Sequence, residues 1–204
     1  MTKTVIIDYG SGNLRSVAKA FEHVSGGLVT VTNNASHLAE ATHIVLPGVG
    51  AFADCMNGLT SLPDMITALE TEVVQNKKPF LGICVGMQLL ANWGHEYGTH
   101  KGLGWIEGEV NRIETLPSLP IPHMGWNSLQ IKQPHALLKD VAPEVYFTHS
   151  YCFNATNPSN IVATTDYGTE ITAIIAKDNI MGVQFHPEKS QQAGLQLLRN
   201  FLTI

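Results

Sequence analysis

The first half of the chain alternates short apolar runs with segments whose apolar residues recur at helical spacing. The runs at 4–8, 28–32, 43–46 and 79–83 predict strands, because they are short, apolar and bounded by turn-forming residues. The periodicity predicts helices at 14–24, 52–59, 63–75 and 85–91, and a short helix capped by Asn34 or Ser36. Apolar strands that alternate with helices are typical of a parallel sheet covered on both faces.

The second half has a different pattern, because residues 102–185 contain more strand-like segments and repeated prolines. Helical periodicity returns at the end, where Leu195, Leu198, Phe201 and Leu202 form one stripe behind Ser190 as the predicted N-cap. No repeat, low-complexity segment or linker divides the sequence. We therefore expect one α/β domain over residues 1–204, with a central, mostly parallel sheet flanked by helices and a strand-rich second half. Its active site is expected at the carboxyl ends of the strands.

Composition narrows the classes of protein. The chain has 204 residues, of which 44% are apolar, so it has enough material for a substantial core. Its net charge is −5 and no basic cluster is present, which argues against an electrostatic nucleic-acid binder. Its first residues hold too short an apolar run for a signal peptide, and no run has the length of a membrane helix. We expect a cytoplasmic protein.

Three cysteines, Cys55, Cys84 and Cys152, lie far apart without a CxxC pair. This spacing argues against a disulfide framework and a structural zinc site. No other cluster has metal-ligand spacing, so neither a metal nor another cofactor is expected. Cys55 and Cys152 are assigned to packing.

Cys84 is the candidate nucleophile, because Gly82 and Gly86 flank it between an expected strand and an expected helix. Glycines let the backbone turn sharply and approach a substrate, and a helix N-terminus favours a thiolate. The N–H of Val85 would face a developing oxyanion. The alternative is a buried, inert cysteine within an apolar run.

The candidate base is His186, which follows an apolar strand and precedes Pro187. A residue before proline favours extended backbone, and side chains two positions apart in an extended chain project to the same side. Glu188 is thus expected to hold the imidazole and stabilise its charged form. The alternative is an ordinary surface turn. His123 and His149 lie in suggestive segments without a nearby carboxylate.

Two glycine-rich segments follow predicted strands. The segment 47–50 ends in Val49 and Gly50, and its backbone N–H groups suit an oxyanion pocket, although a tight strand exit explains it equally well. The segment 9–13 matches neither G-x-G-x-x-G nor the P-loop, so it is weak support for a nucleotide site.

The cysteine and histidine motifs together resemble the class I, triad-type glutamine amidotransferases. Further segments resemble the glutaminase-subunit family of imidazole glycerol phosphate synthase: YGSGN at 9–13, LPGVGAF at 46–52, PHMGWN at 122–127, YFTHSY at 146–151 and QFHPEKS at 184–190. The resemblance extends from about residue 4 to the C-terminus. It departs only slightly, at Val85 and Thr148, and neither change removes a chemical group.

The resemblance implies hydrolysis of glutamine to glutamate and ammonia through a glutamyl thioester on Cys84, with His186 as acid and base and Glu188 holding it. It implies an oxyanion site at Val49 or Gly50 and at Val85. Substrate contacts are implied for a further set of residues: Gln88, Glu96, Ser150 and Tyr151.

The resemblance also implies a heterodimer with a barrel-shaped cyclase subunit, which receives the ammonia and makes imidazole glycerol phosphate and AICAR in histidine biosynthesis. Asn13, Trp126 and Lys189 resemble partner-facing positions, and all three are expected in loops on the face of the thiol. Two alternatives remain open. One is an amidotransferase subunit for anthranilate or pyridoxal phosphate synthesis, and the other is a non-catalytic α/β module with a reactive cysteine.

Overall fold

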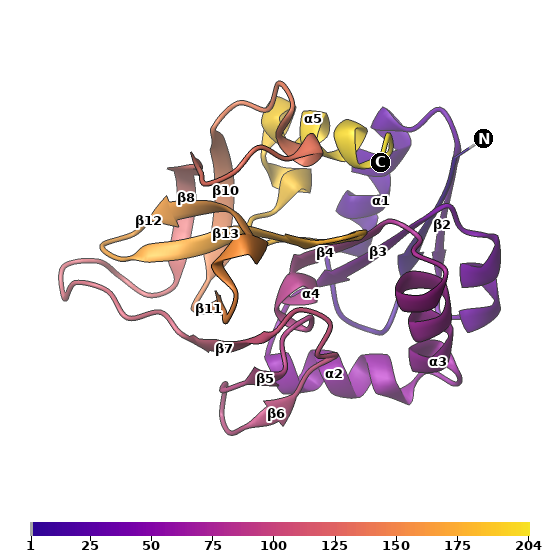
Figure 1. Cartoon of the computed structure of the whole chain (residues 1–204), viewed down its shortest axis with the longest axis horizontal. Helices are drawn as coiled ribbons and strands as arrows, with labels where there is room; N and C mark the ends of the chain where they lie inside the picture. The colour runs from indigo at the N-terminus through magenta and orange to yellow at the C-terminus, as the bar shows by residue number, and fades with distance from the viewer. Residues whose placement is uncertain (1) are drawn as a thin grey trace.

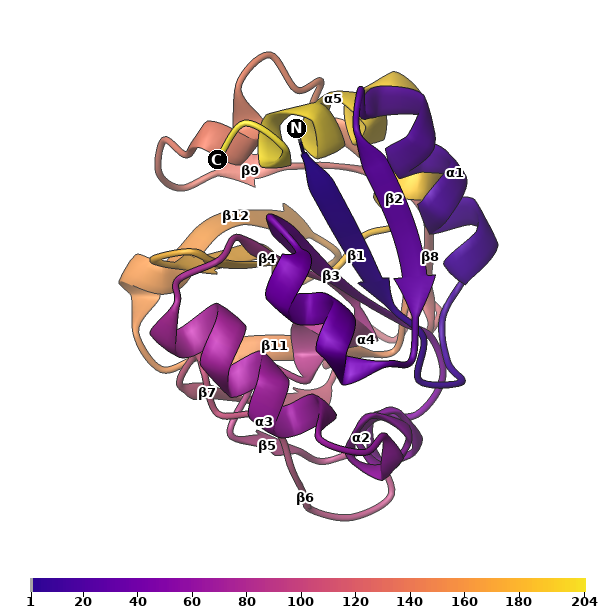
Figure 2. The same cartoon turned by 90° about the vertical axis from the view of Figure 1, so that its right-hand side faces the viewer.

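The computed structural model describes residues 2–204, which form a central eight-stranded sheet with helices on both faces (Figures 1 and 2). The strand order is β2-β1-β3-β4-β14-β13-β12-β9. The strands are β1 (Lys3–Ile7), β2 (Leu28–Thr32), β3 (His43–Gly48), β4 (Phe80–Cys84), β9 (Gln130–Ile131), β12 (Ile161–Asp166), β13 (Glu170–Lys177) and β14 (Ile180–Val183). The first five in the sheet order run parallel, and the last three join antiparallel.

Helices pack on the two sides of this sheet. On one side α1 (Leu14–Val24) contacts α5 (Gln191–Phe201), and on the other α3 (Met65–Leu69) contacts the 3₁₀ helix η1 (Ala35–Glu40) (Figure 2). The helix α2 (Phe52–Ser61) leads into α3, which continues as a π-helical segment, η2 (Glu70–Gln75). The core strands β3, β4 and β14 are buried along their whole length, as expected for a sheet covered on both faces.

Two smaller sheets extend from the carboxyl end of the central sheet (Figure 1). One pairs β8 (His123–Ser128) with β10 (Glu144–His149). The other has the order β11-β7-β5-β6, formed by β11 (Tyr151–Ala155), β7 (Gly108–Arg112), β5 (Trp93–Gly94) and β6 (His100–Lys101). Short 3₁₀ turns complete the chain: η3 (Ala136–Leu138), η4 (Pro158–Asn160) and η5 (Pro187–Lys189).

The predicted strand–helix alternation and the mostly parallel sheet are confirmed. The predicted bounds of α1 and β2 are those of the structure, and Asn34 caps η1 by accepting from the Ser36 N–H. Two predicted strands end slightly later, because β3 continues through Pro47 and Gly48 and β4 includes Cys84. None of the helices in the described part of the chain is long and apolar enough to cross a bilayer.

The predicted helix at 85–91 is wrong in length, since α4 covers only Val85–Gln88. The next residues turn tightly instead, with the Leu90 N–H bonded to the Met87 carbonyl at 3.1 Å. Their own carbonyls accept N–H groups from the returning loop, where Leu103 N–H bonds Leu89 at 2.8 Å and Gly104 N–H bonds Ala91 at 2.9 Å. These long-range bonds replace the helical ones that apolar spacing predicts.

Ser190 occupies the N-cap position of α5, but its side chain does not cap the helix. Its Oγ donates to the His186 carbonyl at 2.7 Å and accepts the Tyr146 N–H at 2.9 Å. The hydroxyl therefore ties the start of η5 to β10, beside the candidate active site. The sequence correctly predicted the position of Ser190 but not its partners.

Candidate active site

Cys84 lies at a sharp turn between β4 and α4, with φ of 55° and ψ of −113°. An L residue is strained in this region, and such strain concentrates at functional sites. The flanking glycines are required by space: a Cβ on Gly86 would lie 1.8 Å from the Leu46 carbonyl oxygen, and one on Gly82 would lie 2.5 Å from the Gly86 carbonyl oxygen. The local geometry is that of a nucleophile elbow.

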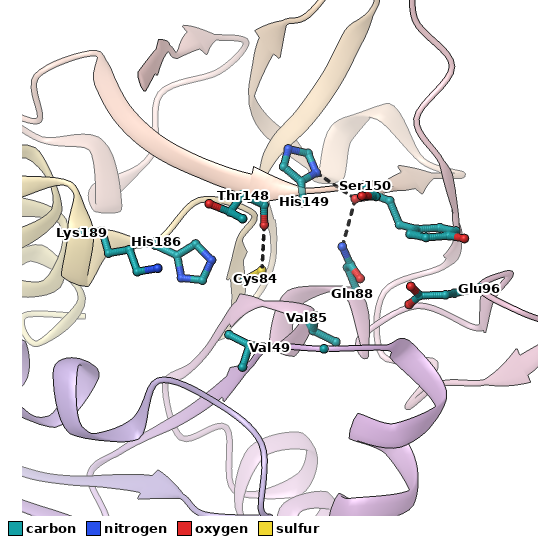
Figure 3. A pocket seen from close by; sticks show the side chains of 12 residues that line it. Val49, Cys84, Val85, Gln88, Glu96, Thr148, His149, Ser150, His186 and Lys189 are labelled. Carbon is teal, nitrogen blue, oxygen red and sulfur yellow. Dashed lines mark hydrogen bonds between the residues drawn. The ribbon is translucent and has the colours of Figure 1, made fainter. Parts of the chain in front are cut away.

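A pocket of about 240 Å³ opens at this elbow (Figure 3). Every residue that the sequence singled out for the oxyanion site or for the substrate lines it, together with Cys84 and His186. The lining residues are Val49, Gly50, Cys84, Val85, Gln88, Glu96, Thr148, His149, Ser150, Tyr151, His186 and Lys189. Cys84 is only 4% exposed, so its sulfur faces the pocket rather than bulk solvent.

His186 and Glu188 are in contact, with His186 Nδ1 2.8 Å from Glu188 Oε1. His186 has the extended backbone expected before proline, but Glu188 lies in the 3₁₀ turn η5 rather than in an extended segment. The predicted contact is therefore present, although the predicted backbone of Glu188 is wrong. The Glu188 side chain is 1% exposed and lies behind the imidazole, on the side opposite the pocket.

The electrostatics of His186 favour its protonated form. Burial lowers its pKa, but hydrogen bonds to Cys84 and Glu188 and the negative charges of both groups raise the pKa to about 10. The carboxylate of Glu188 and the neighbouring sulfur therefore favour a cationic imidazole beside the nucleophile. The Cys84 sulfur also lies 3.9 Å from the Thr148 carbonyl oxygen and 3.8 Å from Gln184 Nε2.

Val49 and Gly50, which follow β3, also line the pocket. Gly50 has φ of 106° and no atom within 4 Å of the place that a Cβ would take, and Val49 is 41% exposed. The Val49 carbonyl accepts hydrogen bonds from Ser11 Oγ and from Cys55 Sγ. This segment is thus held by the β1–α1 loop and by α2, and its position beside Cys84 suits an oxyanion site. Neither Ser11 nor Cys55 was assigned this contact from the sequence.

Gln88 and Glu96 line the far end of the pocket (Figure 3). Gln88 is buried, and its Nε2 donates to the Tyr151 carbonyl and to Gln184 Oε1, both at 3.0 Å. Its Oε1 remains for a ligand. Glu96 lies in the predicted loop, and its Oε2 accepts the N–H of Phe52, the first residue of α2, at 2.8 Å. The predicted arrangement of both residues at one site is present, although the bond to Phe52 was not foreseen.

Two buried histidines lie against the segment that carries Ser150 and Tyr151. His123 Nδ1 is 2.9 Å from His149 Nε2, and His149 Nδ1 is 2.9 Å from the Tyr151 carbonyl oxygen. Burial lowers the pKa of His123 to about 4. Burial lowers the pKa of His149 to about 3, and the positive charges of His123 and His186 lower it as well. The hydrogen bond to the Tyr151 carbonyl raises this pKa and offsets part of the effect. Both rings are therefore neutral at pH 7.

The three predicted partner-facing residues have different settings. Asn13 is half-buried before α1, and Lys189 is exposed in η5. Trp126, 48% exposed, lies in strand β8 rather than in a loop, because that segment pairs with β10. The Trp126 and Tyr146 ring centroids are 6.0 Å apart, and Lys189 Nζ is 5.9 Å from the Tyr146 centroid. Tyr146 begins the YFTHSY segment, but no partner-facing role was assigned to it from the sequence.

Cys55 and Cys152 are buried and all three cysteines are free. Among residues 2–204, no three His, Cys, Asp or Glu side chains are grouped so as to hold a metal ion. The polar side chains that line the pocket carry a thiol, two imidazoles, a carboxylate, an amide, an amine and hydroxyl groups.

Comparison with known proteins gives a consistent result. The family model "Glutamine amidotransferase class-I" matches residues 5–204. The imidazole glycerol phosphate synthase subunit HisH of Zymomonas mobilis is 53% identical, over 97% of this chain and 93% of the HisH chain. The subunit HisH of Rhodospirillum rubrum is 51% identical, over 98% of this chain and 98% of the HisH chain. The structure of PurLQS from Thermotoga maritima superposes with a TM-score of 0.75 at 16% identity, over 99% of this chain and 98% of its own, which shows a shared fold.

Proposed function

Because this chain belongs to the class-I glutamine amidotransferases, and within them to the HisH subunits of imidazole glycerol phosphate synthase, we propose that Cys84, His186 and Glu188 hydrolyse glutamine in it. Residues 1–204 act as a single glutaminase domain in this proposal. The ammonia passes to a cyclase subunit that makes imidazole glycerol phosphate and AICAR.

The observation that carries the proposal is the meeting of three groups that are distant in sequence. Cys84 and His186 line one pocket, and Glu188 binds the imidazole nitrogen that faces away from it. A cationic imidazole beside a sulfur at a strained turn is the arrangement that cysteine nucleophiles use. A non-catalytic module with a reactive cysteine would not need the carboxylate behind the imidazole.

The chemistry follows from the positions of these groups. The Cys84 thiolate attacks the side-chain amide carbon of glutamine, and N–H groups of Val85 and of Val49 or Gly50 stabilise the oxyanion. His186 gives its proton to the leaving nitrogen, which departs as ammonia and leaves a glutamyl thioester. His186 then takes a proton from water, the hydroxide attacks the thioester, and glutamate and the free thiol are released.

The oxyanion site is completed by movement in this proposal. The Val49 carbonyl is held by Ser11 and Cys55. We infer that the segment 47–50 turns N–H groups toward the substrate only in the working complex, so that a free chain wastes little glutamine. Such coupling suits a protein whose ammonia is consumed by another subunit.

Glu96 offers a test of substrate recognition, since its carboxylate is proposed to bind the α-ammonium of glutamine. In Glu96→Gln the amide oxygen still accepts the Phe52 N–H, but the negative charge is gone. Loss of a charge-assisted hydrogen bond raises KM for glutamine about 10- to 100-fold with little change in kcat. Steady-state glutamate release measures both constants. Glu70→Gln is the matched control, because Glu70 is an exposed residue at the start of η2 and does not line the pocket. An unchanged KM for Glu96→Gln contradicts this role.

The coupling is tested by the glutaminase rate with and without the cyclase subunit and its nucleotide ligand. We expect the rate to rise when both are present, and equal rates would refute coupling.

Trp126→Ala should weaken association with the cyclase subunit about 10- to 100-fold, because exposed tryptophans act as interface anchors. Trp93→Ala is the control, since Trp93 is 42% exposed but lies on β5 in the other small sheet. Equal losses of affinity in both variants would contradict the proposed surface.

A further inference from the structure

Gln184 is a buried polar residue that the catalytic scheme does not use. It follows β14 and is 0% exposed, although the strand before it is apolar. Its Nε2 lies 3.8 Å from the Cys84 sulfur, and its Oε1 lies 3.0 Å from Gln88 Nε2. A buried amide is costly unless its polar atoms are bonded, so these two contacts account for its presence in the core.

The direction of the Gln184 amide is imposed by its neighbours. The Tyr151 carbonyl can only accept, so Gln88 must present its NH₂ group there, at 3.0 Å. The second hydrogen of that group then points to Gln184, which must present its oxygen to receive it. The Gln184 NH₂ group is thereby left facing the Cys84 sulfur.

The Tyr151 carbonyl is fixed from its other side by the two buried histidines. His149 donates from Nδ1 to this carbonyl, so His149 Nε2 must accept from His123 Nδ1. Asn127 Nδ2 in turn lies 3.2 Å from His123 Nε2. Each neutral ring has one N–H, so the chain of bonds has a single direction. Figure 3 shows Gln88 and His149 both directed to the same carbonyl.

We propose that Gln184 donates an N–H hydrogen bond to the Cys84 thiolate and stabilises it, and that Gln88 is a positioning residue that orients Gln184. A donor favours the charged form of the group it bonds. The Thr148 carbonyl, 3.9 Å from the sulfur, acts oppositely, because it accepts from a neutral thiol. This inference rests on the proposed role of Cys84, and it assigns Gln88 a task besides substrate binding.

Other titratable groups also face Cys84. His186 approaches from the connection after β14, Tyr9 from the β1–α1 loop and Cys55 from α2. Glu188 lies behind His186, and His149, Glu96 and Lys189 line the pocket wall. All of these groups are retained when Gln184 or Gln88 is replaced. A change in the pH profile of Cys84 in these variants is therefore due to the lost side-chain amide.

The test is the pH profile of Cys84 alkylation by iodoacetamide in the full chain without glutamine, followed by peptide mass spectrometry. Gln184→Met has similar length but no donor. We expect its profile to shift upward by about one pH unit, so that the rate falls about tenfold at pH values well below the wild-type midpoint. Gln192→Met, an exposed glutamine at the start of α5, is the control and keeps the wild-type profile. A wild-type profile in Gln184→Met overturns the proposal.

Gln88→Met provides a second, independent test, because it removes the group that orients Gln184 and leaves Gln184 itself in place. We expect a shift in the same direction, and no further shift when Gln88→Met is added to Gln184→Met. Additive shifts would show that the two residues act separately and would overturn the role of Gln88 in orienting Gln184.

The alkylation experiments and the proposed glutaminase function are tested by different measurements, so that one can fail without the other. Full glutaminase activity in Cys84→Ala would overturn the nucleophile while leaving the alkylation shifts intact. Wild-type alkylation profiles in Gln184→Met and Gln88→Met would overturn the hydrogen bond from Gln184 to Cys84 and leave the role of Cys84 as nucleophile untouched.

Discussion

Cys84→Ala is expected to lower glutamine-dependent turnover by about 10³-fold or more, because no other group can form the thioester. The complex with the cyclase subunit should still use added ammonium salt, since that reaction bypasses the thiol. The two activities are measured in parallel on the same preparation. Cys152→Ala is the control, because Cys152 is buried in a separate small apolar cluster away from the pocket. Glutamine use at the wild-type rate in Cys84→Ala would end the proposed mechanism.

Gly86→Ala is expected to have the second large effect, on stability as well as activity. The added methyl group would lie 1.8 Å from the Leu46 carbonyl oxygen, so β3 and the elbow must move apart. Overpacking of this kind costs about 3 kcal/mol or more in the free energy of unfolding, and the displaced elbow should lose glutaminase activity. Urea denaturation measures the stability.

Gly26→Ala is the matched control for that experiment. A Cβ at Gly26 has nothing within 4 Å, so the change in stability should stay within about 0.5 kcal/mol. If Gly86→Ala were as stable as Gly26→Ala, the close approach of α4 to β3 would not be a constraint on the sequence.

The sequence predicted the elements whose signals are local. Apolar runs and helical periodicity located α1 and β2 with correct bounds, and Gly82 and Gly86 identified the turn at Cys84. The resemblance then named residues that the fold places around one pocket. The predictions of the elements and of the turn succeeded because propensity, periodicity and steric demand act over a few neighbouring residues.

The tertiary structure alone supplied the partners of polar groups that lie far apart in the sequence. Gln184 faces Cys84 across 100 positions of sequence, and Glu96 bonds Phe52 across 44. The same holds for Ser190, which reads as a helix cap but bonds β10. No local pattern encodes which distant donor meets which acceptor.

By itself, the sequence determined the parallel α/β core, the sharp turn that presents Cys84 and the pairing of His186 with Glu188. Only the tertiary structure decided that α4 ends at Gln88 and that a chain of oriented amides and neutral imidazoles leads to the sulfur. The physical reason is that hydrogen bonds are directional and buried polar groups must be paired. Their direction is fixed only when the returning strands bring every donor to its acceptor.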